Sequence, residues 1–73
     1  MDPQATWQRL LDAYSVHDWA ESKDAAEDLL FWLGRCGFPP QILPNLAMDE
    51  AWNRAIAIAA CRFVLLSHGS LNP

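Results

Sequence analysis

Two cysteines and two histidines are the residues of this chain best suited to metal binding or nucleophilic chemistry. Cys36, Cys61, His17 and His68 together hold the donor atoms of a Cys₂His₂ zinc site. No pair of them has the short chelating spacing of such a site. A Cys–His pair for covalent catalysis is also unsupported, because no sequence signal indicates an oxyanion hole or an activated thiol. We therefore expect no metal, no cofactor, no small-molecule substrate and no enzymatic activity.

The two glycines of the segment Leu33-Gly34-Arg35-Cys36-Gly37 do not form a phosphate-binding loop. Such a loop follows a strand and opens a helix, whereas this segment follows an expected helix. We interpret it as a helix end.

The N-terminal segment Met1-Asp2-Pro3-Gln4 lacks the basic region and apolar run of a secretory signal. The longest apolar run, residues 55–61, is much shorter than the ~20 residues that a membrane-spanning helix requires. We therefore predict a cytoplasmic protein that does not enter a membrane, with Cys36 and Cys61 as free thiols.

Acidic residues are concentrated in the first half of the chain, and the net charge is −4. Residues 1–34 carry seven acidic residues against Arg9 and Lys23, whereas residues 35–73 carry two against three arginines. This balance disfavours nonspecific binding to nucleic acid or to an anionic membrane, because both need a basic surface. Five carboxylates on the first two expected helices form either a solvated surface or an acidic docking face for a basic partner: Asp12, Glu21, Asp24, Glu27 and Asp28.

The first helix is predicted over about residues 3–15. Asp2 followed by Pro3 is a typical helix start, because the carboxylate can cap the free amides and proline fits the first helical position. One face carries apolar residues at the helical spacing i, i+3, i+4 and i+7: Trp7, Leu10, Leu11 and Tyr14.

The second helix is predicted over about residues 18–36. Asp18 and Glu21 match an acidic form of the capping box, in which Asp18 caps the helix and Glu21 returns to the amide of Asp18. Gly37 is predicted to take the left-handed conformation just after the helix, with Phe38 folding back. Apolar and small residues line the inner face of this helix: Trp19, Ser22, Ala25, Ala26, Leu29, Leu30 and Leu33.

A proline-rich connector over residues 38–46 is predicted to lead into a third helix over about residues 47–67. Pro39 and Pro40 forbid continuation of the second helix, and residues before prolines are extended. Asp49 and Glu50 suit the first turn of the third helix, where negative charge is favourable. Its stop signals are His68 and Gly69.

The third helix is apolar on nearly every side, so the assignment of its faces matters most. Large residues at helical spacing are predicted to face the first two helices. Because Trp52 lies at the centre of that face, its replacement by alanine is expected to unfold the domain, at a cost of about 3–5 kcal/mol. The predicted inner face includes Trp52, Ile56, Ala59, Phe63 and Leu66.

The opposite face of the third helix and part of the second are predicted to contact another protein molecule. A chain of 73 residues buries a limited fraction of its surface, so a second apolar face needs a further partner. The alternative is a self-sufficient monomer in which Ile42, Leu43 and Leu46 of the connector cover this face. The candidate interface residues are Phe31, Trp32, Ile58, Cys61, Val64 and Leu65.

The first two helices carry a family pattern: Trp7, Leu10 and Tyr14, then Asp18-Trp19 and the small Ser22. These residues resemble the helix-turn-helix of a tetratricopeptide repeat over about 25 residues. The resemblance implies an antiparallel helical hairpin of the kind found in protein-interaction scaffolds. It implies no binding residues for this chain.

Together these features predict a single all-α domain over residues 1–73. It consists of an antiparallel helical hairpin and a third, apolar helix after the connector. The expected function is protein–protein interaction or oligomerisation, through self-association as a dimer or through another protein partner. Docking of a basic partner on the acidic face is the alternative.

Overall fold

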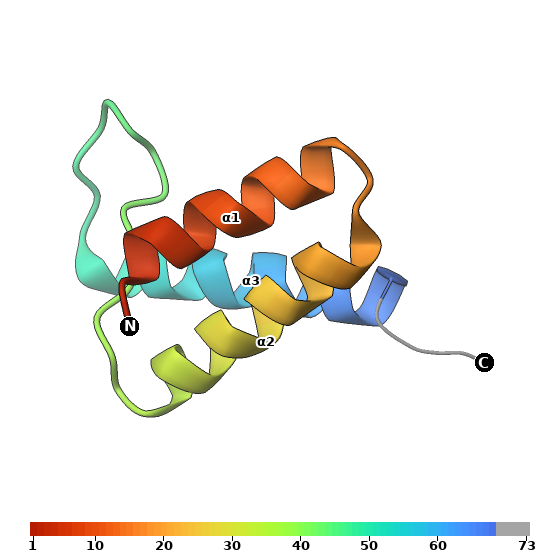
Figure 1. Cartoon of the computed structure of the whole chain (residues 1–73). Coiled ribbons are helices and arrows are strands. Elements are labelled where there is room, and N and C mark those ends of the chain that lie inside the picture. Colours follow the sequence, from red (N-terminus) through yellow and green to blue (C-terminus); the bar gives the residue numbers. More distant parts are fainter. Residues whose placement is uncertain (69–73) are drawn as a thin grey trace.

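The computed structural model describes residues 1–68, which form three α-helices (Figure 1). α1 spans Pro3–Ser15, α2 spans Trp19–Gly34 and α3 spans Glu50–His68. The predicted all-α, three-helix fold is confirmed. α1 and α2 run in opposite directions and are joined by a short turn, whereas a long connector leads to α3. Of the two stop signals predicted for the third helix, Gly69 lies outside the described residues.

In the turn between α1 and α2, Asp18 takes part in both the C-cap of α1 and the N-cap of α2. His17 has a φ of 62° and donates its amide to the Tyr14 carbonyl (3.1 Å), while the Asp18 amide donates to the Ala13 carbonyl (2.9 Å). The Asp18 carboxylate then accepts the Glu21 amide at 3.2 Å, as predicted. The predicted return bond from Glu21 to Asp18 is wrong, because Ala13 already accepts from the Asp18 amide.

The end of α2 is also a paired C-cap, displaced by one residue from its predicted position. Cys36 takes the left-handed conformation, with a φ of 65°, and Gly37 does not. The Cys36 amide donates to Leu33 (3.1 Å) and the Gly37 amide donates to Trp32 (3.0 Å). Gly37 is needed for space, since a Cβ atom there would overlap the indole ring of Trp32.

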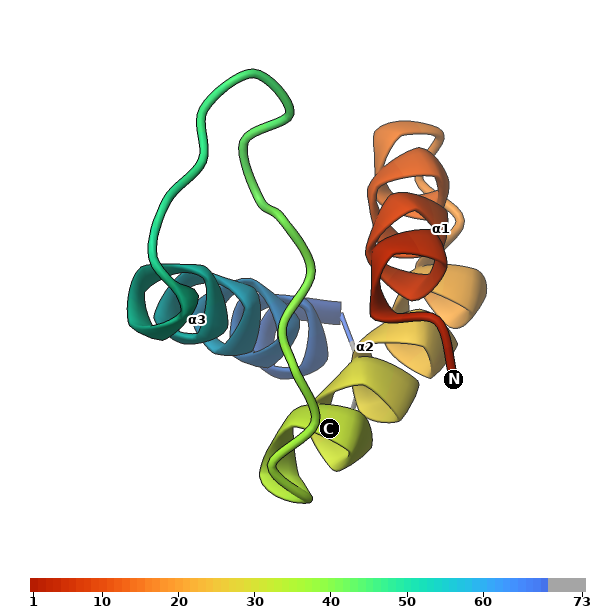
Figure 2. The same cartoon turned by 90° about the vertical axis from the view of Figure 1, so that its left-hand side faces the viewer.

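α2 is the central helix of the fold. α1 and α3 both pack against it, as Figure 2 shows, and Tyr14 of α1 also contacts Phe63 and His68 of α3. Small residues lie where α2 meets α3, and they allow the two helices to approach closely. The core consists of Trp7, Leu10, Ala25, Ala26, Leu29, Leu33, Ala57, Cys61 and Val64.

α3 turns toward α2 the face that the sequence analysis assigned to a partner. Ala57 and Cys61 are fully buried and Val64 is 2% exposed, so the predicted outer face is core. The predicted inner face points outward, with Phe63 56% and Leu66 83% exposed. The face assignment of this helix is therefore wrong.

Two polar residues of α3 fix its rotation. Asn53 accepts the Ile42 amide and donates to the Met48 carbonyl, both at 3.3 Å, which ties the connector to the helix. Arg54 donates to the carbonyls of Leu33 (3.1 Å) and Gly37 (2.9 Å), at the end of α2 and just after it. Both residues can make these bonds only when this side of α3 faces α2 and the connector.

The connector closes one end of the fold without covering the outer side of α3. Gln4 and Gln41 exchange two hydrogen bonds, at 3.1 and 2.7 Å, which join the connector to α1. Ile42 is half-buried against the core, but Leu43 and Leu46 are 36% and 57% exposed. The connector therefore packs one apolar residue, Ile42, against the core and leaves the outer side of α3 uncovered.

Candidate interaction surface

Arg9 of α1 holds together three carboxylates of the predicted acidic face. Its Nε lies 2.7 Å from Glu21, its Nη2 lies 2.7 Å from Asp24 and its Nη1 lies 3.3 Å from Asp28. Burial alone would lower the pKa of Arg9, but the hydrogen bonds to Glu21 and Asp28 raise it, so the guanidinium stays charged. The positive charge of Arg9 therefore offsets part of the negative charge of the three carboxylates. Asp12 and Glu27, the other two predicted residues, are exposed.

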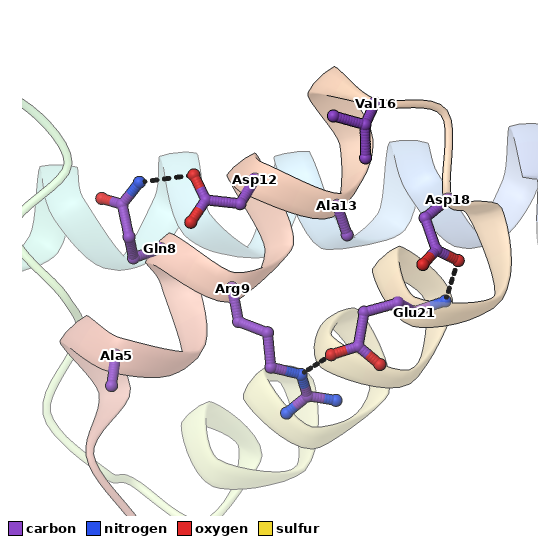
Figure 3. Close-up of a pocket in the computed structure, with 8 residues that line it drawn as sticks. All are labelled: Ala5, Gln8, Arg9, Asp12, Ala13, Val16, Asp18 and Glu21. Carbon is purple, nitrogen blue, oxygen red and sulfur yellow. Dashed lines mark hydrogen bonds and ion pairs between the residues drawn. The ribbon is translucent and has the colours of Figure 1, made fainter.

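A shallow groove runs between α1 and α2 beside this cluster (Figure 3). Gln8 donates to Asp12 at 3.0 Å on its wall, and Asp18 accepts the Glu21 amide at its end. These polar groups already bond one another, so the groove is a poor ligand site. It is lined by Ala5, Gln8, Arg9, Asp12, Ala13, Val16, Asp18 and Glu21.

The six residues predicted to contact a partner do not share one surface. Cys61 and Val64 lie in the core, and Ile58 and Leu65 are half-buried against it. Trp32 and Phe31 belong elsewhere on α2: Trp32 is half-buried and donates its Nε1 to the Phe38 carbonyl at 2.8 Å, while Phe31 is 67% exposed. Cys61 and Val64 are therefore wrong as interface residues, because the fold buries them, while contact through the other four residues stays a prediction.

The outward apolar face of α3 is a row of residues that we call the outer stripe. Trp52 is half-buried and the other four are exposed; the stripe consists of Trp52, Ile56, Ala59, Phe63 and Leu66. The intervals along it alternate between four and three residues, which is the spacing of the contact positions in a coiled coil. The stripe contains no charged residue, although an exposed helix face is normally polar. This recurrence is visible in the sequence, where hydrophobicity predicts that it faces the core.

A second apolar feature, which we call the α1–α3 groove, adjoins the outer stripe. It has a volume of about 300 Å³ and lies between α1 and α3, which contact each other through Tyr14. Phe63 belongs to both the stripe and the groove, and Leu11 stands on the opposite wall, 40% exposed. The groove is lined by Leu10, Leu11, Tyr14, Ser15, Ala60, Phe63 and Val64.

Tyr14, which lines this groove, also belongs to a cluster of packed rings. Trp19 lies between His17 and His68, with ring centroids 5.0 and 4.0 Å away, and the Tyr14 hydroxyl lies 3.1 Å from Nε2 of His68. The histidines considered as metal ligands thus serve as stacking partners. Within residues 1–68, no three His, Cys, Asp or Glu side chains lie close enough together to hold a metal ion.

Both cysteines carry free thiols, as predicted, but their surroundings differ. Cys36 is exposed at the end of α2, whereas Cys61 is buried between α3 and α2. Burial raises the pKa of the Cys61 thiol to about 11, which keeps it protonated and unreactive at neutral pH.

Comparisons of this chain with protein-family models, with curated proteins and with solved structures find no match. None of the helices within residues 1–68 is both long enough and apolar enough to cross a bilayer. The likeness to a tetratricopeptide hairpin stays a prediction. Functional inference therefore rests on the outer stripe and the groove beside it.

Proposed function

We propose that this protein is a small helical interaction module that binds another protein molecule through the outer stripe of α3. The observation that carries the proposal is the alternation of four- and three-residue intervals between apolar side chains of which four are exposed and one, Trp52, is half-buried. In a coiled-coil contact these positions insert between side chains of a facing helix. The surface of the partner is accordingly an apolar helix face.

The position of α2 supports the same proposal. A helix that contacted both α1 and α3 across the α1–α3 groove would fill the position opposite α2 and complete a bundle of four helices. Phe63 and Leu11 would then be covered from both sides of the groove. Because both side chains are already partly covered, each would contribute about half of the roughly 1.5–3 kcal/mol that full burial of a large apolar side chain gives.

Docking of a basic partner on the acidic face is the weaker proposal. Arg9 already pairs with Glu21, Asp24 and Asp28, so a partner's cations would compete with a guanidinium that is held in place. Binding through this face would weaken steeply as salt is raised, whereas binding through the outer stripe would not.

Photo-crosslinking in the cells that produce the protein tests the proposal. A benzophenone amino acid replaces Phe63 on the outer stripe in one variant and Phe31 on α2 in the control. Both residues are exposed phenylalanines, so the change is matched. We expect a covalent adduct with a protein at position 63 and none at position 31. Adducts at position 31 alone, or at neither position, would contradict the proposal.

A further inference from the structure

We infer that the occupant of the outer stripe is a second copy of this chain, with the two α3 helices antiparallel about a two-fold axis at Ala59. This inference rests on the proposed function and names its partner. It is carried by three independent features of α3 and its surroundings: the order of the side chains along the stripe, the distribution of charge, and the area available.

The order of side chains along the stripe suits pairing with itself in the antiparallel direction. Trp52 and Leu66 each lie seven residues from Ala59, while Ile56 and Phe63 lie three and four residues from it. A two-fold axis at Ala59 therefore sets Trp52 against Leu66 of the other copy, and Ile56 beside Phe63 of the other copy. Small alanines meet at the centre and allow close approach of the helices, and large side chains interlock on either side.

The charge distribution favours α3, rather than another face of the protein, as the surface that contacts a second copy. The protein has a net charge of −4, so two copies repel each other unless their acidic residues stay apart. The Arg9 cluster lies between α1 and α2, whereas α3 carries one acidic residue, Glu50, against Arg54 and Arg62. Contact through α3 places the acidic surfaces on the far sides of the dimer.

The third feature is the extent of the apolar surface, which we compare with what a stable dimer needs. A stable dimer interface buries about 1,200 Å² or more in total, counted over both copies. Each copy would therefore contribute roughly one eighth of its 4547 Å² surface. α3 is 19 residues long, or about 28 Å, and the outer stripe runs along most of that length. Leu11 on α1 extends the apolar surface beside Phe63.

The first test is the mass of the protein in solution, by size-exclusion chromatography with light scattering. We expect the mass to approach twice 8.2 kDa as the concentration rises through the micromolar range. Leu66→Glu, at a position 83% exposed, should fold normally and weaken the dimer about 30-fold or more, while Phe31→Glu should leave it unchanged. A wild-type mass of 8.2 kDa at high micromolar concentration would overturn the inference.

Cysteine cross-linking tests the antiparallel register. In a Cys36→Ser background, mild oxidation of Ala59→Cys should give a disulfide-linked dimer, while the exposed control Ala20→Cys should not. Buried Cys61 does not compete. Ile56→Cys and Phe63→Cys should cross-link when mixed but not alone. Cross-linking of each variant with itself would mean parallel helices and would overturn the stated register.

The two proposals fail in distinguishable ways. If the crosslinker at position 63 captures a different protein and the chain itself stays monomeric, the interaction module stands and the self-association is wrong. If position 63 captures nothing, both are wrong.

Discussion

At the scale of single residues, close contacts explain where small side chains are needed. Gly37 lies against the indole of Trp32, which is itself held by a 2.8 Å hydrogen bond to the Phe38 carbonyl. Gly34, at the last position of α2, has nothing within 4 Å of the place a Cβ atom would occupy. Gly37 is therefore required for space, whereas the position of Gly34 can accept a larger side chain.

Replacement of these glycines by alanine should change stability in opposite directions. Gly37→Ala forces Trp32 from its site and should lower the free energy of unfolding by about 1–3 kcal/mol. Gly34→Ala should raise it by about 0.4–1 kcal/mol, because alanine restricts the unfolded chain. Urea unfolding of both variants measures the difference. Equal effects at the two positions would show that Trp32 does not limit the space at Gly37.

Cys61 should make the protein less stable at high pH. Its pKa is raised from 9.0 to about 11 by burial, so below pH 9 the thiol is protonated in both folded and unfolded chains. Between these values only the unfolded thiol ionises, and the free energy of unfolding falls by about 2 kcal/mol. Urea unfolding at about pH 8 and about pH 10.5 measures the loss. Cys61→Ala should show a smaller loss, and Cys36→Ala should behave like the wild type.

At the scale of helices, the contacts that join neighbouring elements are polar as well as apolar. Arg9 joins α1 to α2, Arg54 joins α3 to the end of α2, and Asn53 joins α3 to the connector. Each of these side chains bonds charged groups or backbone groups of a neighbouring element. They determine how the helices are rotated, which apolar burial alone leaves open.

Removal of the Arg9 charge should loosen the contact between α1 and α2. The pairs are partly exposed, so each is modest, and Arg9→Met should lower the free energy of unfolding by about 1–2 kcal/mol at low salt. Added salt should then stabilise the variant, because it screens the repulsion between the remaining carboxylates. Thermal unfolding at low and high salt measures this. Arg62→Met, which removes a charge without an ion pair among residues 1–68, is the control and should change little.

At the scale of the whole molecule, one helix has two apolar faces and the fold covers only one. α2 covers the face with Ala57, Cys61 and Val64, while the outer stripe and the α1–α3 groove stay open. Trp52 lies on the open side, half-buried, so the expectation that Trp52→Ala unfolds the domain loses its basis. The stability of the folded chain should instead depend on whether a second copy covers the outer stripe.

The unfolding temperature should therefore depend on protein concentration. A second copy that binds only the folded chain stabilises it by mass action. We expect the midpoint of thermal unfolding to rise by about 5 °C or more over a roughly hundredfold increase in concentration. Leu66→Glu should keep one midpoint throughout. A constant midpoint for the wild type would contradict self-association.

Local signals were sufficient for the elements of this fold. Asp2 with Pro3 placed the start of α1, Asp18 placed the start of α2, and the prolines after Gly37 separated α2 from α3. Such signals depend on a few neighbouring residues, because caps and proline act within one turn. The left-handed residue at the end of α2 was misplaced by one position, since Gly37 is required by Trp32 rather than by its own backbone.

The chain by itself determined that α3 has two apolar faces, because that follows from residue type and helical spacing. Only the tertiary structure decided which face is buried. Hydrophobicity favoured the larger side chains. The small residues Ala25, Ala26 and Ala57 instead share the core, and Asn53 and Arg54 reach the connector and the end of α2. Those partners are distant in sequence. Their positions, rather than the apolar pattern, turned Phe63 and Leu66 outward.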